Sequence, residues 1–71
     1  MKYPNIEAEC IKMGLTEAAL AKTIGVTPKT VNDWQAAKKE IPASKIFAMA
    51  DLFHVSTDYL LSRTASTAQG G

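Results

Sequence analysis

The sequence predicts an all-α domain built from short helices around one core. Apolar residues recur at helical spacing along most of the chain, and no segment shows the alternating pattern of a strand. With 71 residues, 46% of them hydrophobic, the chain can fill one small core. The final stretch, SRTASTAQGG, has no apolar anchor. We therefore expect one domain over residues 1–61 and a flexible tail over residues 62–71.

The first helix is expected over residues 4–13. Ile6, Cys10 and Met13 recur on one side of it, which would face the core. Gly14 is expected to end this helix, because glycine takes the left-handed conformation at a helix C-terminus without steric cost.

Two short helices joined by a tight turn are predicted over residues 16–35, TEAALAKTIGVTPKTVNDWQ. Gly25 can end the first of them in the left-handed conformation, and Thr27 can cap the second directly afterwards. Pro28 then falls at the first helical position, where the missing N–H of proline is not needed. Thr16 is the matching N-cap of the first helix. One helix ends and the next begins within five residues, which indicates a helix-turn-helix.

Each helix of this unit has an inward face and an outward face. Ala21 is small and would let the two helices approach closely. The inward positions follow helical spacing and are Leu20, Ile24, Val31 and Trp34. The outward positions of the second helix are Pro28, Lys29, Asn32, Asp33 and Ala36.

Two further helices are expected after the helix-turn-helix. Pro42 marks the start of one, which runs through Ser44 to Phe53. Its expected buried residues are Ile46, Phe47, Met49 or Ala50, and Phe53. Ser56 or Thr57 caps the last helix, whose apolar residues are Tyr59, Leu60 and Leu61.

Composition excludes several classes of protein. The single cysteine cannot form an internal disulfide, no spacing suits a metal, and no signal peptide or membrane-spanning run is present. The lone His54 has no partnered nucleophile, so we expect no enzyme and no cofactor. No small-molecule ligand is evident, and a cytoplasmic protein is the default expectation.

The net charge of +1 is low for a protein that binds phosphate groups. The distribution of charge is more informative than the total. Four lysines lie on or just after the second helix of the helix-turn-helix, at Lys29, Lys38, Lys39 and Lys45. One face could therefore be positive.

These residues resemble the Cro/C1 type of DNA-binding domain, found in phage Cro proteins, phage repressors and bacterial regulators of the xenobiotic-response-element type. The resemblance covers residues 4–61. The matching segments are Gly14-Leu15-Thr16, Leu20-Ala21, Ile24-Gly25-Val26, Thr30-Val31, Trp34, Pro42, Ala50, Leu52-Phe53, Val55-Ser56, Asp58 and Leu60-Leu61. The resemblance implies a compact five-helix, λ-repressor-like fold in which the third helix lies in the DNA major groove.

The resemblance also implies roles for individual residues. The expected base-reading residues are Pro28, Lys29, Thr30, Asn32 and Asp33; Lys29 could donate to guanine and Asp33 could accept from cytosine. The expected phosphate contacts are Thr16, Glu17, Thr27, Lys38, Lys39 and Ser44. Glu17 replaces the usual glutamine of the family, and its carboxylate also suits the positive end of the helix dipole. The candidate dimer contacts are Tyr59, Leu60 and Leu61.

Four further positions depart from the family pattern. A common ion pair of the family is replaced by Cys10 and Gln35, which predicts a small core thiol and an amide satisfied by backbone. The family favours glycine after its third and fourth helices, where this chain has Ala37 and His54. We expect His54 to act as a left-handed cap, and Ala37 to extend its helix into Lys38 or Lys39.

The leading function is a transcriptional regulator, a repressor of phage or prophage type, that binds a palindromic operator of double-stranded DNA as a homodimer. The alternative is an antitoxin or partner-binding module with the same fold. A complete regulator and the N-terminal domain of a longer one both fit the sequence.

Overall fold

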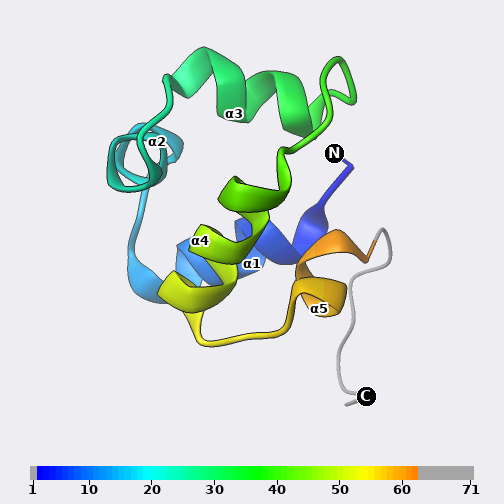
Figure 1. Ribbon diagram of the computed structural model, residues 1–71. Coiled ribbons are helices and arrows are strands. Elements are labelled where there is room, and N and C mark those ends of the chain that lie inside the picture. Colours follow the sequence, from blue (N-terminus) through cyan, green and yellow to red (C-terminus); the bar gives the residue numbers. More distant parts are fainter. Residues whose placement is uncertain (1, 63–71) are drawn as a thin grey trace.

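The computed structural model describes residues 2–62, and the part of the predicted tail from residue 63 onward lies outside them. Within the described residues the chain forms five helices and no strand, so the predicted all-α fold is confirmed (Figure 1). The helices are α1 (Pro4–Met13), α2 (Glu17–Ile24), α3 (Pro28–Gln35), α4 (Ala43–Phe53) and α5 (Thr57–Leu61).

One core lies between the helices, where α2 packs on α3 and α5 packs on both α1 and α4. Leu20, Met49 and Leu60 are completely buried in it. The predicted core positions of Trp34 and Cys10 are confirmed, since each is at most 6% exposed.

Three predictions about burial are wrong. Met13 and Phe47 were expected in the core but are 48% and 65% exposed. They stand at the edge of their helices' apolar stripes, where periodicity alone does not separate covered positions from uncovered ones. Leu60 was expected at a dimer contact but is 0% exposed, because α5 packs it inward against α1 and α4. Leu60 is therefore a core residue and offers no surface to a partner.

Hydroxyl side chains cap three of the helices at their N-termini. Thr16 Oγ1 accepts from Ala19 N–H at 3.1 Å, and Ser56 Oγ accepts from Tyr59 N–H at 3.1 Å. Thr27 caps α3 in the same way. Each cap gives a partner to a backbone donor that the helix itself cannot satisfy.

The helices α1 to α4 share one C-terminal motif. A residue in the left-handed conformation follows each helix. The backbone N–H of the residue after it donates to the carbonyl of the residue five positions before that donor. For α2 these are Gly25, with φ +83°, and the 2.8 Å bond from Val26 to Ala21. Gly14 and His54 were predicted to end their helices in this conformation, and both predictions are confirmed.

The fourth left-handed residue is Ala37, with φ +62°, and it corrects the prediction for α3. This helix does not continue into Lys38 or Lys39. It ends at Gln35, and Lys38 N–H donates to Asp33 O at 2.8 Å. The hydrogen bonds of the motif offset the cost of placing a Cβ atom in this region, which is about 1–2 kcal/mol.

Gln35 fastens the N-terminal segment to the end of α3. Its Oε1 accepts from Tyr3 N–H at 2.8 Å, and its Nε2 donates to Tyr3 O at 3.0 Å. Lys2 N–H also donates to Gln35 O at 2.9 Å. The prediction that backbone groups satisfy the Gln35 amide is confirmed.

A second polar contact joins α1 to α5. Glu9 is buried, and its Oε2 accepts from the Tyr59 hydroxyl at 2.8 Å and from Lys12 Nζ at 2.9 Å. Burial alone would raise the pKa of Glu9, but these two hydrogen bonds outweigh it and hold the pKa below its ordinary value of 4.5.

Replacing Ala37 with glycine should raise the free energy of unfolding by about 1 kcal/mol, because glycine takes a positive φ without steric cost. Urea denaturation measures the change. Ala36→Gly is the control, since Ala36 has φ −86°, where alanine is unstrained. An equal rise in the free energy of unfolding for both variants would show that relief of the left-handed conformation at Ala37 is not the source of the added stability.

Stability should fall as the pH drops through the folded-state pKa of Glu9. The folded state favours the charged carboxylate, so this contribution is complete above the unfolded-state value of 4.5 and is lost in more acid solution. Tyr59→Phe removes one of the two donors and should make stability less sensitive to acid. Thermal melting between about pH 7 and pH 3 tests this, and an unchanged acid dependence in the variant would contradict it.

Candidate nucleic-acid interface

The junction between α2 and α3 fixes how α3 lies on the domain. The left-handed Gly25 reverses the chain, and Thr27 caps α3 two residues later. Ala21, on α2, is 0% exposed, and α2 packs on α3. Figure 1 shows α3 lying across one end of the molecule, with α2 beside its first turn. The predicted helix-turn-helix is present with its expected turn.

The two faces of α3 differ in burial. Val31 and Trp34 are 2% and 3% exposed and hold the helix on the core. Pro28, Lys29 and Asn32 are exposed, as predicted for the outer face, and Thr30 is half-buried. The outer face of α3 therefore presents three predicted base-reading side chains to solvent, while Val31 and Trp34 anchor the helix on the core.

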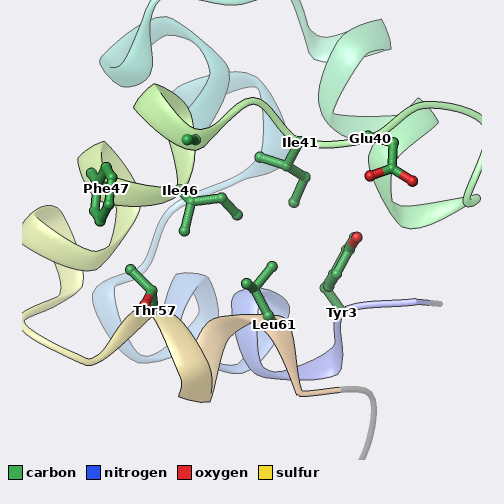
Figure 2. Close-up of a pocket in the computed structure, with 8 residues that line it drawn as sticks. Tyr3, Glu40, Ile41, Ile46, Phe47, Thr57 and Leu61 are labelled. Atoms are coloured by element: carbon green, nitrogen blue, oxygen red, sulfur yellow. The ribbon is translucent and has the colours of Figure 1, made fainter.

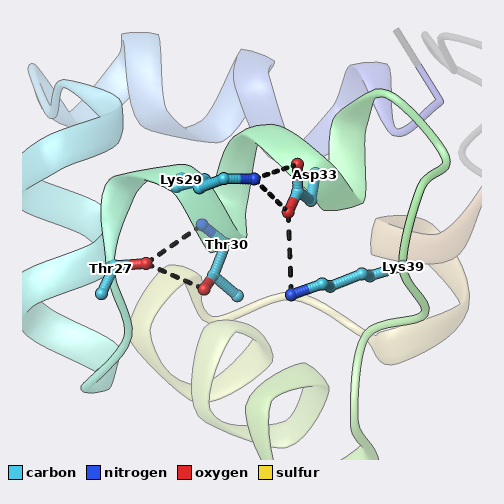
Figure 3. A network of polar contacts seen from close by, with 5 residues as sticks. All are labelled: Thr27, Lys29, Thr30, Asp33 and Lys39. Carbon is cyan, nitrogen blue, oxygen red and sulfur yellow. Dashed lines mark hydrogen bonds and ion pairs between the residues drawn. The ribbon is translucent and has the colours of Figure 1, made fainter.

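Thr30 is held by the cap of its own helix. Thr27 Oγ1 accepts from Thr30 N–H at 3.2 Å, and the two hydroxyl oxygens lie 2.9 Å apart (Figure 3). The hydroxyl groups of these two predicted contact residues are thus already paired with each other in the free protein.

Asp33 does not lie on the exposed face where the sequence placed it. Its side chain is 5% exposed, and its Oδ2 lies 3.2 Å from Lys29 Nζ and 3.8 Å from Lys39 Nζ. Figure 3 shows the carboxylate between the two lysine side chains. The chain reversal at Ala37 turns the segment after α3 back along the helix and so brings Lys39 to this position. Asp33 was predicted to accept a hydrogen bond from a cytosine amino group; in the protein without DNA, its carboxylate is paired with Lys29 and Lys39.

The predicted phosphate-contacting residues occupy two regions beside α3. Thr16 and Glu17 are exposed at the start of α2. Lys38 and Lys39 are exposed in the segment after α3, and Ser44 is exposed in the first turn of α4. Both helix N-termini carry free N–H groups and a positive dipole end.

Lys45 has a structural role that the sequence did not reveal. Its Nζ donates to Ile24 O at 2.8 Å, at the C-terminal end of α2. This ammonium group satisfies a terminal carbonyl and suits the negative end of the helix dipole. Lys45 therefore stabilises the start of the turn, and its ammonium group keeps its positive charge. A contact between residues 21 apart in the sequence has no local signal.

An apolar groove of about 350 Å³ lies between the start of α4, α5 and the N-terminal segment (Figure 2). Phe47 and Leu61 line it and are 65% and 41% exposed. The two remaining predicted dimer contacts, Tyr59 and Leu61, lie in different places. Leu61 lines the groove, whereas the Tyr59 hydroxyl points away to Glu9 in α1. The other lining residues are Tyr3, Glu40, Ile41, Ala43, Ile46 and Thr57.

A second cleft, of about 260 Å³, lies beside Cys10, Leu15 and the start of α2. Burial raises the pKa of the Cys10 thiol, and the carboxylates of Glu17, Glu7 and Glu9 raise it further. The neutral thiol is therefore favoured, which suits a core residue and not a reactive one.

Over residues 2–62 no three side chains of the metal-binding types converge on one point. None of the described helices is long and apolar enough to cross a membrane.

A family model described as helix-turn-helix matches residues 6–60 of this chain. The match includes the helix-turn-helix itself and all of α4. A comparison with curated proteins finds no match.

Solved structures of repressors share the fold. The chain is similar to the phage P22 c2 repressor in complex with synthetic operator 9T, with a TM-score of 0.71 and 29% identity, over 83% of this chain and 89% of that one. It is also similar to the DNA-binding domain of the P22 c2 repressor in solution, with a TM-score of 0.69 and 29% identity, over 86% of each chain. The SOS-response repressor LexA from Eubacterium rectale gives a TM-score of 0.74 at 26% identity, over 96% of this chain and 72% of that one.

Proposed function

We propose that this chain, which belongs to the Cro/C1-type helix-turn-helix family, binds double-stranded DNA sequence-specifically and represses transcription. The observation that carries the proposal is the outer face of α3, where Lys29 and Asn32 are exposed, on a helix anchored on the core by Val31 and Trp34. The similarity to a repressor solved on its operator supports the same use of α3. Such a role belongs in the cytoplasm beside the DNA, and it requires no catalysis and no cofactor.

The exposed side chains of α3 suit the edges of base pairs in the major groove. The ammonium group of Lys29 can donate to guanine O6 or N7. Asn32 can both donate to and accept from adenine, while Pro28 offers apolar surface to a thymine methyl group. Thr30 can join them after its hydroxyl leaves Thr27. We assign base reading to these four residues.

Phosphate groups on either side of the major groove would be held by the surrounding elements. Thr16, with the N–H groups at the start of α2, fits one phosphate. Lys38 and Ser44 fit another, from the segment after α3 and the first turn of α4. The remaining predicted phosphate contacts border these positions and are Thr27, Glu17 and Lys39. The carboxylate of Glu17 repels phosphate, so its presence is better explained by its favourable interaction with the positive end of the α2 dipole.

A second copy of this chain is the expected occupant of the apolar groove. Phe47 and Leu61 leave a continuous apolar surface there, and pairing of two such surfaces by a two-fold axis would bury both. A two-fold dimer requires a palindromic operator whose half-sites lie about 34–36 Å apart, one turn of DNA.

Selection of bound duplexes from a random DNA pool at about 150 mM salt tests the proposed function. The selected sequence is then titrated against a scrambled duplex of equal length. Enrichment of a palindromic motif with strong discrimination is expected. Failure to enrich any sequence would contradict DNA reading and favour a module that binds a protein partner.

Lys29→Ala should weaken binding to the selected duplex by about 1–3 kcal/mol and relax the preference at one base pair, because a base contact is lost. Lys38→Ala should weaken binding to all duplexes alike and reduce the slope of log K against log salt by about 1. Fluorescence anisotropy over a set of single-base-pair variants measures both effects. Equal losses on every duplex for Lys29→Ala would make Lys29 a phosphate contact.

Phe47→Asp should abolish cooperative binding to the two half-sites and leave binding to one half-site unchanged, because a carboxylate in the paired groove is costly to bury. Ile11→Asp is the matched control, since Ile11 is an equally exposed apolar residue on α1 at 70%. Titration of duplexes with one and two half-sites separates the effects. Loss of cooperativity in both variants, or in neither, would contradict dimerisation through the groove.

A further inference from the structure

The least exposed charge near the proposed DNA-binding face is the carboxylate of Asp33. Its side chain is 5% exposed, whereas those of its partners Lys29 and Lys39 are 81% and 63% exposed. Both carboxylate oxygens are engaged by Lys29 Nζ, Oδ2 at 3.2 Å and Oδ1 at 3.5 Å. Lys39 Nζ lies 3.8 Å from Oδ2 and approaches it from a different direction (Figure 3). The arrangement is one covered negative charge with two positive charges facing solvent.

Asp33 also fixes the backbone that carries the second lysine. Its carbonyl accepts from Lys38 N–H at 2.8 Å, in the motif that ends α3. The side chain of Asp33 then meets the ammonium group of the next residue, Lys39. The position of Lys39 against α3 therefore depends on Asp33 twice, through its main chain and through its carboxylate.

This geometry leaves little access for a base. A cytosine amino group could reach the Asp33 carboxylate only by displacing Lys29, which would give up an ion pair to gain one hydrogen bond. DNA, in contrast, can reach both ammonium groups from solvent without moving Asp33, at a base edge for Lys29 and at a phosphate for Lys39. The two lysines that pair with Asp33 are thus the same two that face DNA.

We propose that Asp33 is a positioning residue that acts on DNA only through Lys29 and Lys39. It holds the two ammonium groups in place on α3, and its charge reduces their attraction for phosphates of any sequence. Discrimination between operator and other DNA depends on the positioning of Lys29, because an ammonium group that is already held on α3 loses less freedom when it meets its base. The inference rests on the proposed DNA-binding function.

Asp33→Asn tests the proposal, because it removes the charge and keeps the shape and one acceptor. Binding to scrambled DNA should strengthen by about 3- to 10-fold at about 150 mM salt, and the salt slope should steepen by about 1. The ratio of affinities for selected and scrambled duplexes should fall. Asp51→Asn is the matched control, since it changes net charge equally at an exposed position on α4. It should change neither affinity by more than about twofold.

The same substitution in a Lys29→Gln/Lys39→Gln background isolates the route of the effect. Glutamine can still donate to a carboxylate, so Asp33 keeps a hydrogen-bonding partner and the fold is retained, as thermal melting will verify. Asp33→Asn should have no effect on scrambled DNA in this background. A loss confined to the selected duplex, with an altered preference at one base pair in both backgrounds, would show that Asp33 reads a base directly and would overturn the proposal.

A measurement without DNA separates this inference from the proposed function. Side-chain ¹⁵N relaxation should show restricted Lys29 and Lys39 ammonium groups in the unmodified protein, with exposed Lys22 as the mobile reference. In the Asp33→Asn variant, the ammonium groups of Lys29 and Lys39 should both become as mobile as that of Lys22. Mobile Lys29 and Lys39 in the unmodified protein would overturn the positioning role even if DNA binds, whereas failure of the unmodified protein to bind any duplex would overturn the proposed function.

Discussion

The close contact between α2 and α3 is the constraint on which the rest of the structure depends. Ala21 on α2 is completely buried, and Gly25 takes the positive φ that turns the chain two residues before the cap of α3. Lys45 holds the carbonyl of Ile24 at the same corner. Because α3 is fixed at its start by this turn and along its length by Val31 and Trp34, its outer residues need no packing role of their own. They are free to differ between proteins that read different DNA.

The end of α3 is as tightly determined as its start. The reversal at Ala37 returns the chain along the helix, so that one short segment brings Lys39 to Asp33 while Gln35 binds the backbone of Tyr3. The surface proposed to meet DNA therefore combines residues from α3 with residues that follow it. On this surface the carboxylate of Asp33 is buried while the ammonium groups of Lys29 and Lys39 are exposed. A chain with a net charge of only +1 can therefore present exposed lysines on one face.

Most of the fold could be predicted from local signals. Proline at the start of α1 and α3, hydroxyl caps, and glycine or histidine at three helix ends each act within a few residues, and the structure agrees with them. The end of α3 was predicted wrongly, because alanine rarely takes a positive φ; the glycine that the family favours at this position was the one signal for it. Asp33 is buried although it was expected on the outer face, and its contact with Lys39 crosses that same turn. The partners of Gln35 and Lys45 lie 32 and 21 residues away, beyond the reach of any local pattern. The base-reading and phosphate roles remain predictions, since they concern a partner outside the chain.

Titration of the ¹⁵N-labelled protein with its selected duplex is the most direct test of the central claim, that α3 reads the major groove from a position set by α2. Amide shifts should concentrate in the first turns of α2 and α3 and in residues 38–44, while α1 and the core face of α5 stay unchanged. Shifts centred on α1 or on the groove beside Phe47, with α3 unaffected, would contradict the account.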